Sequence, residues 1–441
     1  MLGCRKIYNI LITLSKGRGD HHGTTIFYKI KVSIRKKKAT IISLAERLDF
    51  LTARATVFRQ GIVSLILASL GSLIGGIYLG SYSETLHLFP GLIIMIPAAI
   101  GMRGNIFASL GSRMSTALHV GEISRLGKSP LVTDNVSASL VLTLIVSCYL
   151  AILSRAAAAI FGFASISIID LIVISVVGGF ISSLLILSVT LLIAIQSFLR
   201  GWDPDNVTAP LITSVGDLVT LPCLFLAIQM LRWKYLIFTG ILLACVICCV
   251  VLIRTRSPQV MKILKDSVFI LMLSAVLSTG SGLVINARIT QFISLSGLLI
   301  LLPPFLEGGG ALGGILSSRL STSLHLGMIQ PALNPPREVV EDFLVVALLG
   351  VTLFPSIGVL AFLASTLLHL EFPPLSSVIL ACLYAGLLIA AVVSFLSYYA
   401  AILSTRFGLD PDSVVIPMIT GSMDFLGTNA LILALLFLGI A

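Results

Sequence analysis

The sequence predicts an all-α protein, a polytopic membrane helix bundle of about eleven transmembrane helices. Three observations predict this class. The chain is 57% hydrophobic and 11% charged, and its mean hydropathy of +1.08 is far above that of soluble domains. Its apolar segments reach about 20 residues or more, enough to cross a bilayer core about 30 Å thick. Two phrases from the first half also recur in the second half at nearly the same offset, which indicates an internal repeat.

The region before the first apolar segment is strongly basic. It holds 13 of the 29 Lys and Arg residues within the first 59 positions. Such a cluster is compatible with nucleic-acid binding, but Lys and Arg beside a first span also hold that end in the cytoplasm, next to anionic lipid. We favour the second interpretation. Residues 1–54 are thus expected to form a basic cytoplasmic tail, with the lipid bilayer and no nucleic acid as its partner.

Hydropathy then predicts each span in order along the chain. Five spans form a first group, at 57–79, 88–110, 137–161, 167–199 and 208–231. One extra span follows at 235–253. Five more form a second group, at 267–287, 291–316, 339–368, 373–403 and 414–440. The predicted organisation is a first five-helix unit at 55–233, a linker helix and loop at 234–266, and a second unit at 267–441.

The repeat relates these two units. The phrase "SRMSTALHVG" at 112–121 returns as "SRLSTSLHLG" at 318–327, with seven of ten positions identical. The extra span returns the chain to its starting side of the membrane. Both units therefore begin on the same side and run parallel, related by an axis along the membrane normal. One chain would then be a pseudo-dimer that functions as a monomer.

Charge in the short loops predicts the orientation. With the N-terminus inside, the cytoplasmic loops hold eleven Lys and Arg residues and the outer loops hold three. Short-loop Lys and Arg bias orients such proteins, so a cell-membrane protein with a cytoplasmic N-terminus and an outer C-terminus is expected.

A second repeated phrase carries the candidate chemistry. "DPDNVTAPLITSVGD" ends at Asp217, and "DPDSVVIPMITGSMD" ends at Asp424. Each final Asp lies near the bilayer midplane, where a carboxylate costs several kcal/mol unless it faces a cavity, a partner or an ion. A structural hydrogen bond is one alternative. Recurrence at symmetric positions favours a cation between two facing acids.

Other oxygen donors accompany the deep acids. Thr213 and Thr420 precede them by four residues, one helical turn away on the same face. Mg²⁺ prefers oxygen ligands and keeps part of its water shell, so two carboxylates with hydroxyls suit it. At the inner mouth of the same helices, Asp side chains either cap the helices or form a cation-attracting vestibule. These mouth residues are Asp203, Asp205, Asp410 and Asp412.

The second span of each unit is rich in Gly and Pro and adds polar groups at membrane depth. Asn105 and Ser109 in the first copy and Glu307 in the second are candidates to line a pathway. Arg103 pairing with Glu307 across the pseudo-two-fold axis is an alternative. No GxxxxGK[ST] motif occurs, so the sequence gives no support to ATP-driven pumping.

With these motifs in hand, residues 55–440 resemble the MgtE and solute carrier family 41 group of divalent-cation transporters, in the tandem-fused form. The resemblance implies that Asp217 and Asp424 are the central ion-binding carboxylates and that Asn105 matches the Asn of the family's G-N motif. The second copy has Ala311 at that place. The tail of about 50 residues leads us to expect none of the cytoplasmic sensor domains typical of the MgtE branch.

The expected function is therefore transport of a divalent cation, most simply Mg²⁺, without enzymatic activity or an organic cofactor. Three alternatives stay open from the sequence. The first is an exchanger coupled to Na⁺ or H⁺. The second is a non-transporting scaffold with structural acids, and the third is a carrier for an organic cation.

Overall fold

The computed structural model describes Phe58 and residues 61–119, 129–200, 204–255, 257–325, 327–406 and 411–440. All packing discussed below lies within one compact unit, Gln60–Ala441. Every regular element in the described residues is helical, so the predicted all-α class is confirmed. The predicted basic tail at 1–54 lies outside the described residues.

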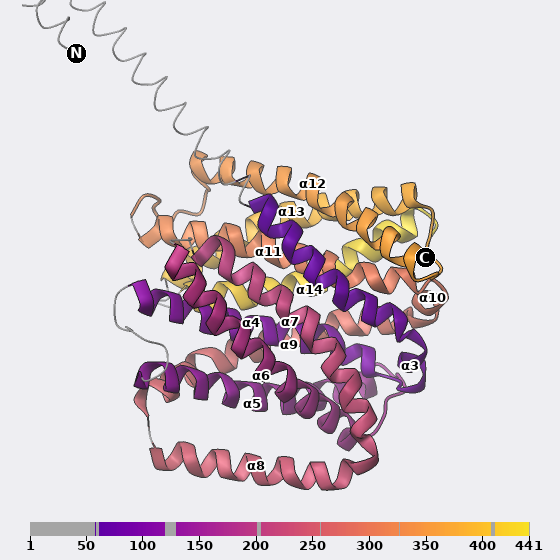
Figure 1. Ribbon diagram of the computed structural model, residues 1–441. Helices are drawn as coiled ribbons and strands as arrows, with labels where there is room; N and C mark the ends of the chain where they lie inside the picture. Colours follow the sequence, from indigo (N-terminus) through magenta and orange to yellow (C-terminus); the bar gives the residue numbers. More distant parts are fainter. Residues whose placement is uncertain are drawn as a thin grey trace, which may run out of the picture. The chain divides into compact units, whose positions relative to one another are not determined.

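The first group of helices follows the predicted order. A helix at Gly61–Ser81 comes first. A short helix and four long ones follow (Figure 1): α3 (Ser83–Leu88), α4 (Leu92–His119), α5 (Pro130–Ile160), α6 (Ile168–Arg200) and α7 (Pro204–Gln229). Pro130 and Pro204 begin their helices, at the position where the missing N–H of proline removes no intrahelical bond.

The same order of elements recurs in the second half. It comprises α9 (Pro258–Ala287), α10 (Ile289–Ser294), α11 (Gly297–His325), α12 (Arg337–Leu367), α13 (Leu375–Arg406) and α14 (Pro411–Phe437). The short helices α3 and α10 both have six residues. The helices α7 and α14 begin at the same position of the repeated acidic phrase, Pro204 and Pro411.

A 3-10 turn, η1 (Met230–Trp233), and α8 (Lys234–Thr255) connect the two halves. Figure 1 shows α8 at one edge of the bundle, and its first residue forms an ion pair of 2.9 Å with Asp170 of α6. Many of its large side chains are exposed, including Leu236 and Leu243. In a membrane, such a surface faces lipid.

Ten segments of the described residues are long and apolar enough to cross a membrane. One of them, Leu211–Val251, has 41 residues and contains most of α7, all of η1 and most of α8. Figure 1 shows α7 and α8 as separate helices, and η1 lies between them in the chain. Dividing the long segment at η1 gives eleven membrane-spanning segments in the described residues, which is the predicted number. The protein is a multi-pass membrane helix bundle.

One close backbone contact between the two halves is made twice. Gly76 of the first helix lies against the carbonyl oxygen of Ile300 on α11, with no space for a Cβ. Gly282 of α9 lies in the same way against the carbonyl oxygen of Ile94 on α4. The two glycines occupy equivalent positions of the repeat, and so do the two isoleucines. Each half therefore packs its leading helix on the next long helix of the other half.

Candidate functional site

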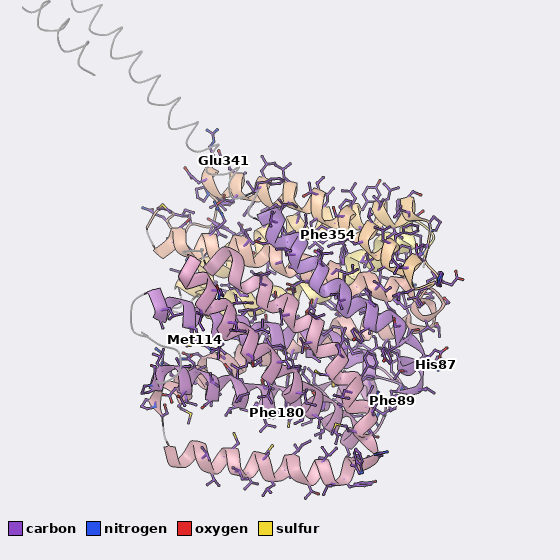
Figure 2. All side chains as sticks on the ribbon, in the orientation of Figure 1. His87, Phe89, Met114, Phe180, Glu341 and Phe354 are labelled. Atoms are coloured by element: carbon purple, nitrogen blue, oxygen red, sulfur yellow. The ribbon has the colours of Figure 1, made fainter. Side chains whose placement is uncertain are left out.

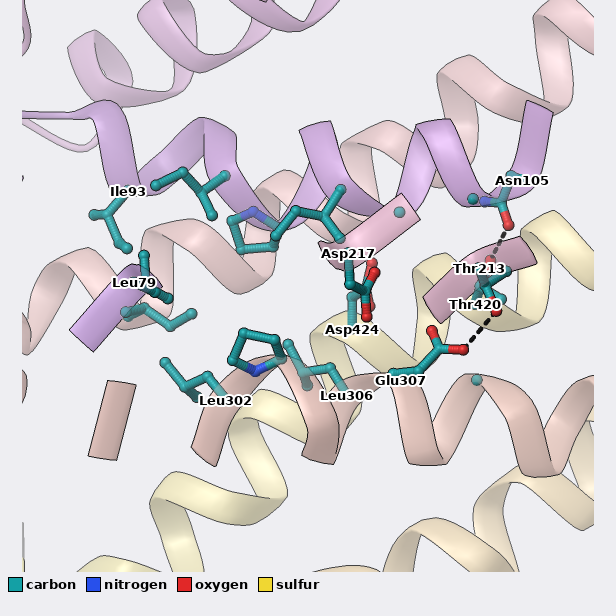
Figure 3. Close-up of a pocket in the computed structure, with 18 residues that line it drawn as sticks. Leu79, Ile93, Asn105, Thr213, Asp217, Leu302, Leu306, Glu307, Thr420 and Asp424 are labelled. Carbon is teal, nitrogen blue, oxygen red and sulfur yellow. Dashed lines mark hydrogen bonds between the residues drawn. The ribbon is translucent and has the colours of Figure 1, made fainter. Parts of the chain in front are cut away.

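A cavity of about 50 Å³ lies in the interior of the bundle (Figure 3), lined mainly by α4, α7, α11 and α14, with Leu79 of the first helix and Ile285 of α9. Leu79, Ile93 and Leu302 lie toward one end of it. The polar side chains in its lining are Asn105, Thr213, Asp217, Glu307, Thr420 and Asp424. The volume suits a small cation with a few water molecules.

The two deep acids lie side by side in this cavity, as Figure 3 shows. Each lies near the middle of its helix, at the same distance along the chain from the proline that begins that helix. A buried serine hydroxyl donates to each carboxylate at 2.5 Å. Ser72 donates to Asp217, and Ser278 of α9 donates to Asp424. Equivalent sequence positions thus produce equivalent carboxylate environments.

The surroundings of the Asp217 and Asp424 carboxylates differ at one position of the repeat. Position 101 of α4 is Gly, and a Cβ there would lie 3.1 Å from Oδ2 of Asp424. The equivalent position of α11 is Glu307, which lines the same cavity as Asp217. The Asp217 residue is 5% exposed, whereas Asp424 is only half-buried. The cavity is therefore asymmetric in its chemistry.

Two hydrogen bonds cross between the halves at the polar end of the cavity. The Thr213 hydroxyl on α7 donates to Oε1 of Glu307 on α11 at 2.5 Å. The Thr420 hydroxyl on α14 donates to Oδ1 of Asn105 on α4 at 2.9 Å. The cavity-lining glycines permit this approach, because Gly104 lies against Thr213 and Gly310 lies against Thr420.

Two side chains of α4 that the sequence offered as candidates lie away from the cavity. Ser109 is one turn beyond Asn105, does not line the cavity, and accepts a hydrogen bond of 3.4 Å from Arg113. The alternative pairing of Arg103 with Glu307 is wrong. The buried Arg103 guanidinium donates instead to the carbonyl oxygen of Ala99 and to Ser147 of α5, at 2.9 and 2.8 Å.

The acids at the inner mouth stay a prediction. Asp205 and Asp412 lie in the first turns of α7 and α14. Asp203 and Asp410 lie outside the described residues. Neither a capping role nor a vestibule is assigned to them by the structure.

Sequence reasoning missed Ser72 and Ser278, which bind the two deep acids. A signal was present, since each serine precedes the tightly packed glycine of its helix by four residues, at Gly76 and Gly282. Such a pattern, present in both copies of the repeat, marks one face of both leading helices. It does not by itself say which buried group that face meets.

The arrangement of donors is looser than a closed metal site. Among the residues that the structure describes, no group of three His, Cys, Asp or Glu side chains is arranged to hold a metal ion. The polar lining of the cavity nevertheless consists of carboxylates, hydroxyls and one amide, all with oxygen atoms. Such a lining suits a hard cation that keeps part of its water shell.

The bundle and its acid-lined interior define the class of a polytopic membrane transporter for cations. Comparison with known families gives the same class: the MgtE family, described as divalent cation transporter, matches residues 96–227 and 302–434. These two segments make up more than half of the chain. The chain belongs to the MgtE family of divalent cation transporters, and its substrate class is a divalent metal cation.

Curated relatives extend the same similarity over most of the chain. Solute carrier family 41 member 3 of Rattus norvegicus is 28% identical over 407 residues, which cover 86% of each chain. Solute carrier family 41 member 2 of Mus musculus is 29% identical over 86% of this chain and 70% of its own length. The crystal structure of the eukaryotic MATE transporter AtDTX14 covers 87% of this chain and 96% of its own, with 12% identity and a TM-score of 0.29.

Proposed function

We propose that this chain transports Mg²⁺ through the cavity between α4, α7, α11 and α14, with Asp217 and Asp424 meeting the ion near mid-membrane. The supporting observation is that these two acids, which come from opposite halves of the sequence, face one small cavity lined by oxygen donors. Thr213, Thr420, Asn105 and Glu307 complete the proposed lining. Mg²⁺ is favoured because one or two carboxylates with retained water suit its tightly held shell.

The proposal includes the organisation of the chain. The units at 55–233 and 267–441 run parallel about an axis along the membrane normal, and the linker at 234–266 allows this. A single chain then supplies both sides of the pathway as a pseudo-dimer. The N-terminus is cytoplasmic and the C-terminus lies outside. With a negative interior, a divalent ion gains about 4.6 kcal/mol per 100 mV on entry, which favours import through an uncoupled path.

Uptake of Mg²⁺ into proteoliposomes tests the proposal. Wild type is compared with Asp217→Asn and Asp424→Asn, and Asp266→Asn is the matched control because that acid is exposed at the start of α9. We expect both cavity variants to lose most uptake and the control to keep it. Each variant must also be monodisperse and as thermally stable as wild type.

The outcome also separates the alternatives. Full uptake by both folded cavity variants would make the repeated acids structural and place the pathway elsewhere. A wild-type protein that moves no divalent cation would favour the scaffold. Replacing Na⁺ at zero membrane voltage separates a Na⁺-coupled exchanger from an uncoupled path, because only the exchanger responds to the Na⁺ gradient.

A further inference from the structure

We propose that the apolar end of the cavity is a gate, which opens when the first turns of α4 and α11 bend at Pro97 and Pro303. This inference rests on the proposed function and adds to it how an ion gains access to the two acids. The apolar end takes no part in binding a cation, and in the proposed topology it faces outside.

Four apolar side chains line this end of the cavity, and we call them the apolar cluster. They form two pairs from equivalent positions of the repeat, Leu79 with Ile285 and Ile96 with Leu302. Figure 3 shows Leu79 and Leu302 at this end. Ile285 is 1% exposed and the other three are each 2% exposed. Because the two acids are also a repeat-related pair, the apolar cluster and the acids share one axis in the proposed organisation.

The apolar cluster is a barrier to a hydrated divalent cation. Mg²⁺ gives up its water reluctantly and takes oxygen atoms in exchange. The side chains of the apolar cluster have no oxygen atoms, and a narrow apolar passage gates ions because water leaves it. At the other end of the cavity, Asn105, Thr213 and Thr420 supply oxygen atoms. An ion that enters from the apolar end therefore needs the cluster to separate.

A proline marks the same point of both helices at this end. Pro97 lies in the second turn of α4, and Pro303, followed by Pro304, lies in the second turn of α11. Proline has no N–H for the carbonyl group four residues earlier, and helices bend at such positions. The turns before the prolines, residues 92–96 and 297–302, are therefore outer segments that can tilt while the rest of each helix stays in place.

Each outer segment is held by the leading helix of the other half. Gly282 of α9 lies against the carbonyl oxygen of Ile94, and Gly76 of the first helix lies against the carbonyl oxygen of Ile300. Each glycine precedes the member of the apolar cluster on its own helix by three residues. A tilt of the outer segments therefore moves the leading helices as well, and all four side chains of the apolar cluster move apart.

The leading helices also connect the gate to the acids. Ser72 and Ser278 lie on these helices and donate to Asp217 and Asp424. Each serine precedes the member of the apolar cluster on its helix by seven residues, which is about two helical turns. This spacing places the two side chains on one face of the helix. A cation that displaces the serine from the carboxylate thus acts on the helix that carries part of the gate.

Cysteine labelling from one side of the membrane tests the gate without measuring transport. The probe is a charged, membrane-impermeant methanethiosulfonate reagent, added to intact cells. The reporter is Ile100→Cys, which lines the cavity one turn beyond Ile96. We expect slow labelling of this cysteine. Labelling should become about 10-fold faster when Leu79→Ser and Ile285→Ser make the apolar cluster polar. Wild type without the reporter gives the background from native cysteines.

Two exposed positions identify the side on which the reagent acts. Figure 2 shows Phe89, which lies just before α4, and Met114 of α4 at opposite ends of the bundle. Leu88→Cys marks the first of these ends, and Met328→Cys marks the other, since both residues are exposed. The reagent is applied on the side that labels Leu88→Cys, with inverted vesicles if that side is the inner one.

The matched control for the two serines is Leu236→Ser with Leu243→Ser, on the exposed side of α8. This pair should leave the labelling rate of Ile100→Cys unchanged. The gate is overturned if Ile100→Cys is labelled as fast as Leu88→Cys without the serines. It is also overturned if the serines do not accelerate labelling in a protein whose Tm matches that of the control pair.

The hinge is tested separately with Pro97→Ala and Pro303→Ala, which restore two backbone N–H groups and favour straight helices. The initial rate of Mg²⁺ uptake into proteoliposomes should fall about 10-fold in this double variant. Its affinity for Mg²⁺, measured by calorimetry, should stay within about 2-fold of wild type. The matched control is Pro355→Ala in α12, a proline that does not line the cavity, and it should keep wild-type uptake.

Wild-type uptake by the folded double proline variant would overturn the hinge. This result also decides the proposal if the serine pair lowers the Tm too far for labelling. Absence of Mg²⁺ uptake in wild type overturns the proposed function itself, whereas the labelling rates report on the gate whether or not Mg²⁺ is the transported ion.

Discussion

The two sides of the cavity share a scaffold and differ in what lines it. On one side Asp217 has Ser72 as its donor and Glu307 on the neighbouring helix. On the other side Asp424 has Ser278 as its donor and Gly101 on the neighbouring helix. Backbone geometry and carboxylate placement are alike in the two copies, while one position has no side chain in the first copy and an acid in the second.

The repeat therefore places groups at equivalent positions in the two halves, but the side chains at those positions, and so their chemistry, can differ. The Gly101 side leaves Asp424 half-buried, with space beside its carboxylate. The Glu307 side fills that space with a further charge, and Asp217 is 5% exposed. We therefore expect Asp424 to be the more accessible of the two acids to an arriving ion.

The largest expected effect follows from filling the open side with Gly101→Leu. The new Cβ would lie 3.1 Å from Oδ2 of Asp424, and the rest of the side chain would occupy much of a cavity of about 50 Å³. The initial rate of Mg²⁺ uptake into proteoliposomes should fall about 100-fold, which corresponds to about 2.7 kcal/mol.

The control for this prediction is Gly240→Leu on α8, where a Cβ meets nothing within 4 Å. It should transport at the wild-type rate. Wild-type uptake by a well-folded Gly101→Leu protein would show that the ion does not pass beside Asp424.

The sequence was a good guide to the fold for a physical reason. In a bilayer the chain must satisfy its backbone groups within each span, so long apolar segments specify helices almost by themselves. The nearly constant offset of the repeat further located both deep acids, and it placed Thr213 and Thr420 in the same cavity. The number of spans followed from hydropathy alone.

Partners across helices were harder to predict from the same patterns. Arg103 and Glu307 lie at similar depth, yet Arg103 faces α5 and α6 because Gly179 of α6 makes room for its guanidinium. Small residues are common in all the spans, so the sequence does not single out this glycine. Ser109 accepts a hydrogen bond from Arg113 and does not line this cavity, so its place on a pathway stays a prediction.

A smaller effect is expected at the contact that is made twice. Gly76→Ala and Gly282→Ala each place a Cβ against a carbonyl oxygen of the other half, at Ile300 and Ile94. A backbone carbonyl group cannot move aside as the end of a flexible side chain can. Each substitution should therefore destabilise the fold by about 2 kcal/mol. Thermal unfolding in detergent measures this as a lower Tm.

Because the two contacts are equivalent, Gly76→Ala and Gly282→Ala should lower the Tm by similar amounts. Gly240→Ala serves as the control, with open space at its Cβ. A large shift for one substitution beside none for the other would mean that the halves do not share this packing.

The smallest expected effect concerns the serine donors, and it tests whether the two acids differ in access to water. Ser72→Ala removes the donor from the more buried Asp217, and a lost hydrogen bond there should cost about 1 kcal/mol. Ser278→Ala should cost less, because water can reach the half-buried Asp424 and replace the hydroxyl. The decrease in Tm of each variant, measured at a fixed detergent concentration, shows which substitution costs more.

Equal decreases in Tm would mean that both carboxylates are equally shielded from water. A larger decrease for Ser278→Ala would reverse the assignment of Asp424 as the more accessible acid. Because each substitution removes one hydroxyl and leaves the packing of its leading helix unchanged, the difference between them reports on the carboxylates rather than on the scaffold.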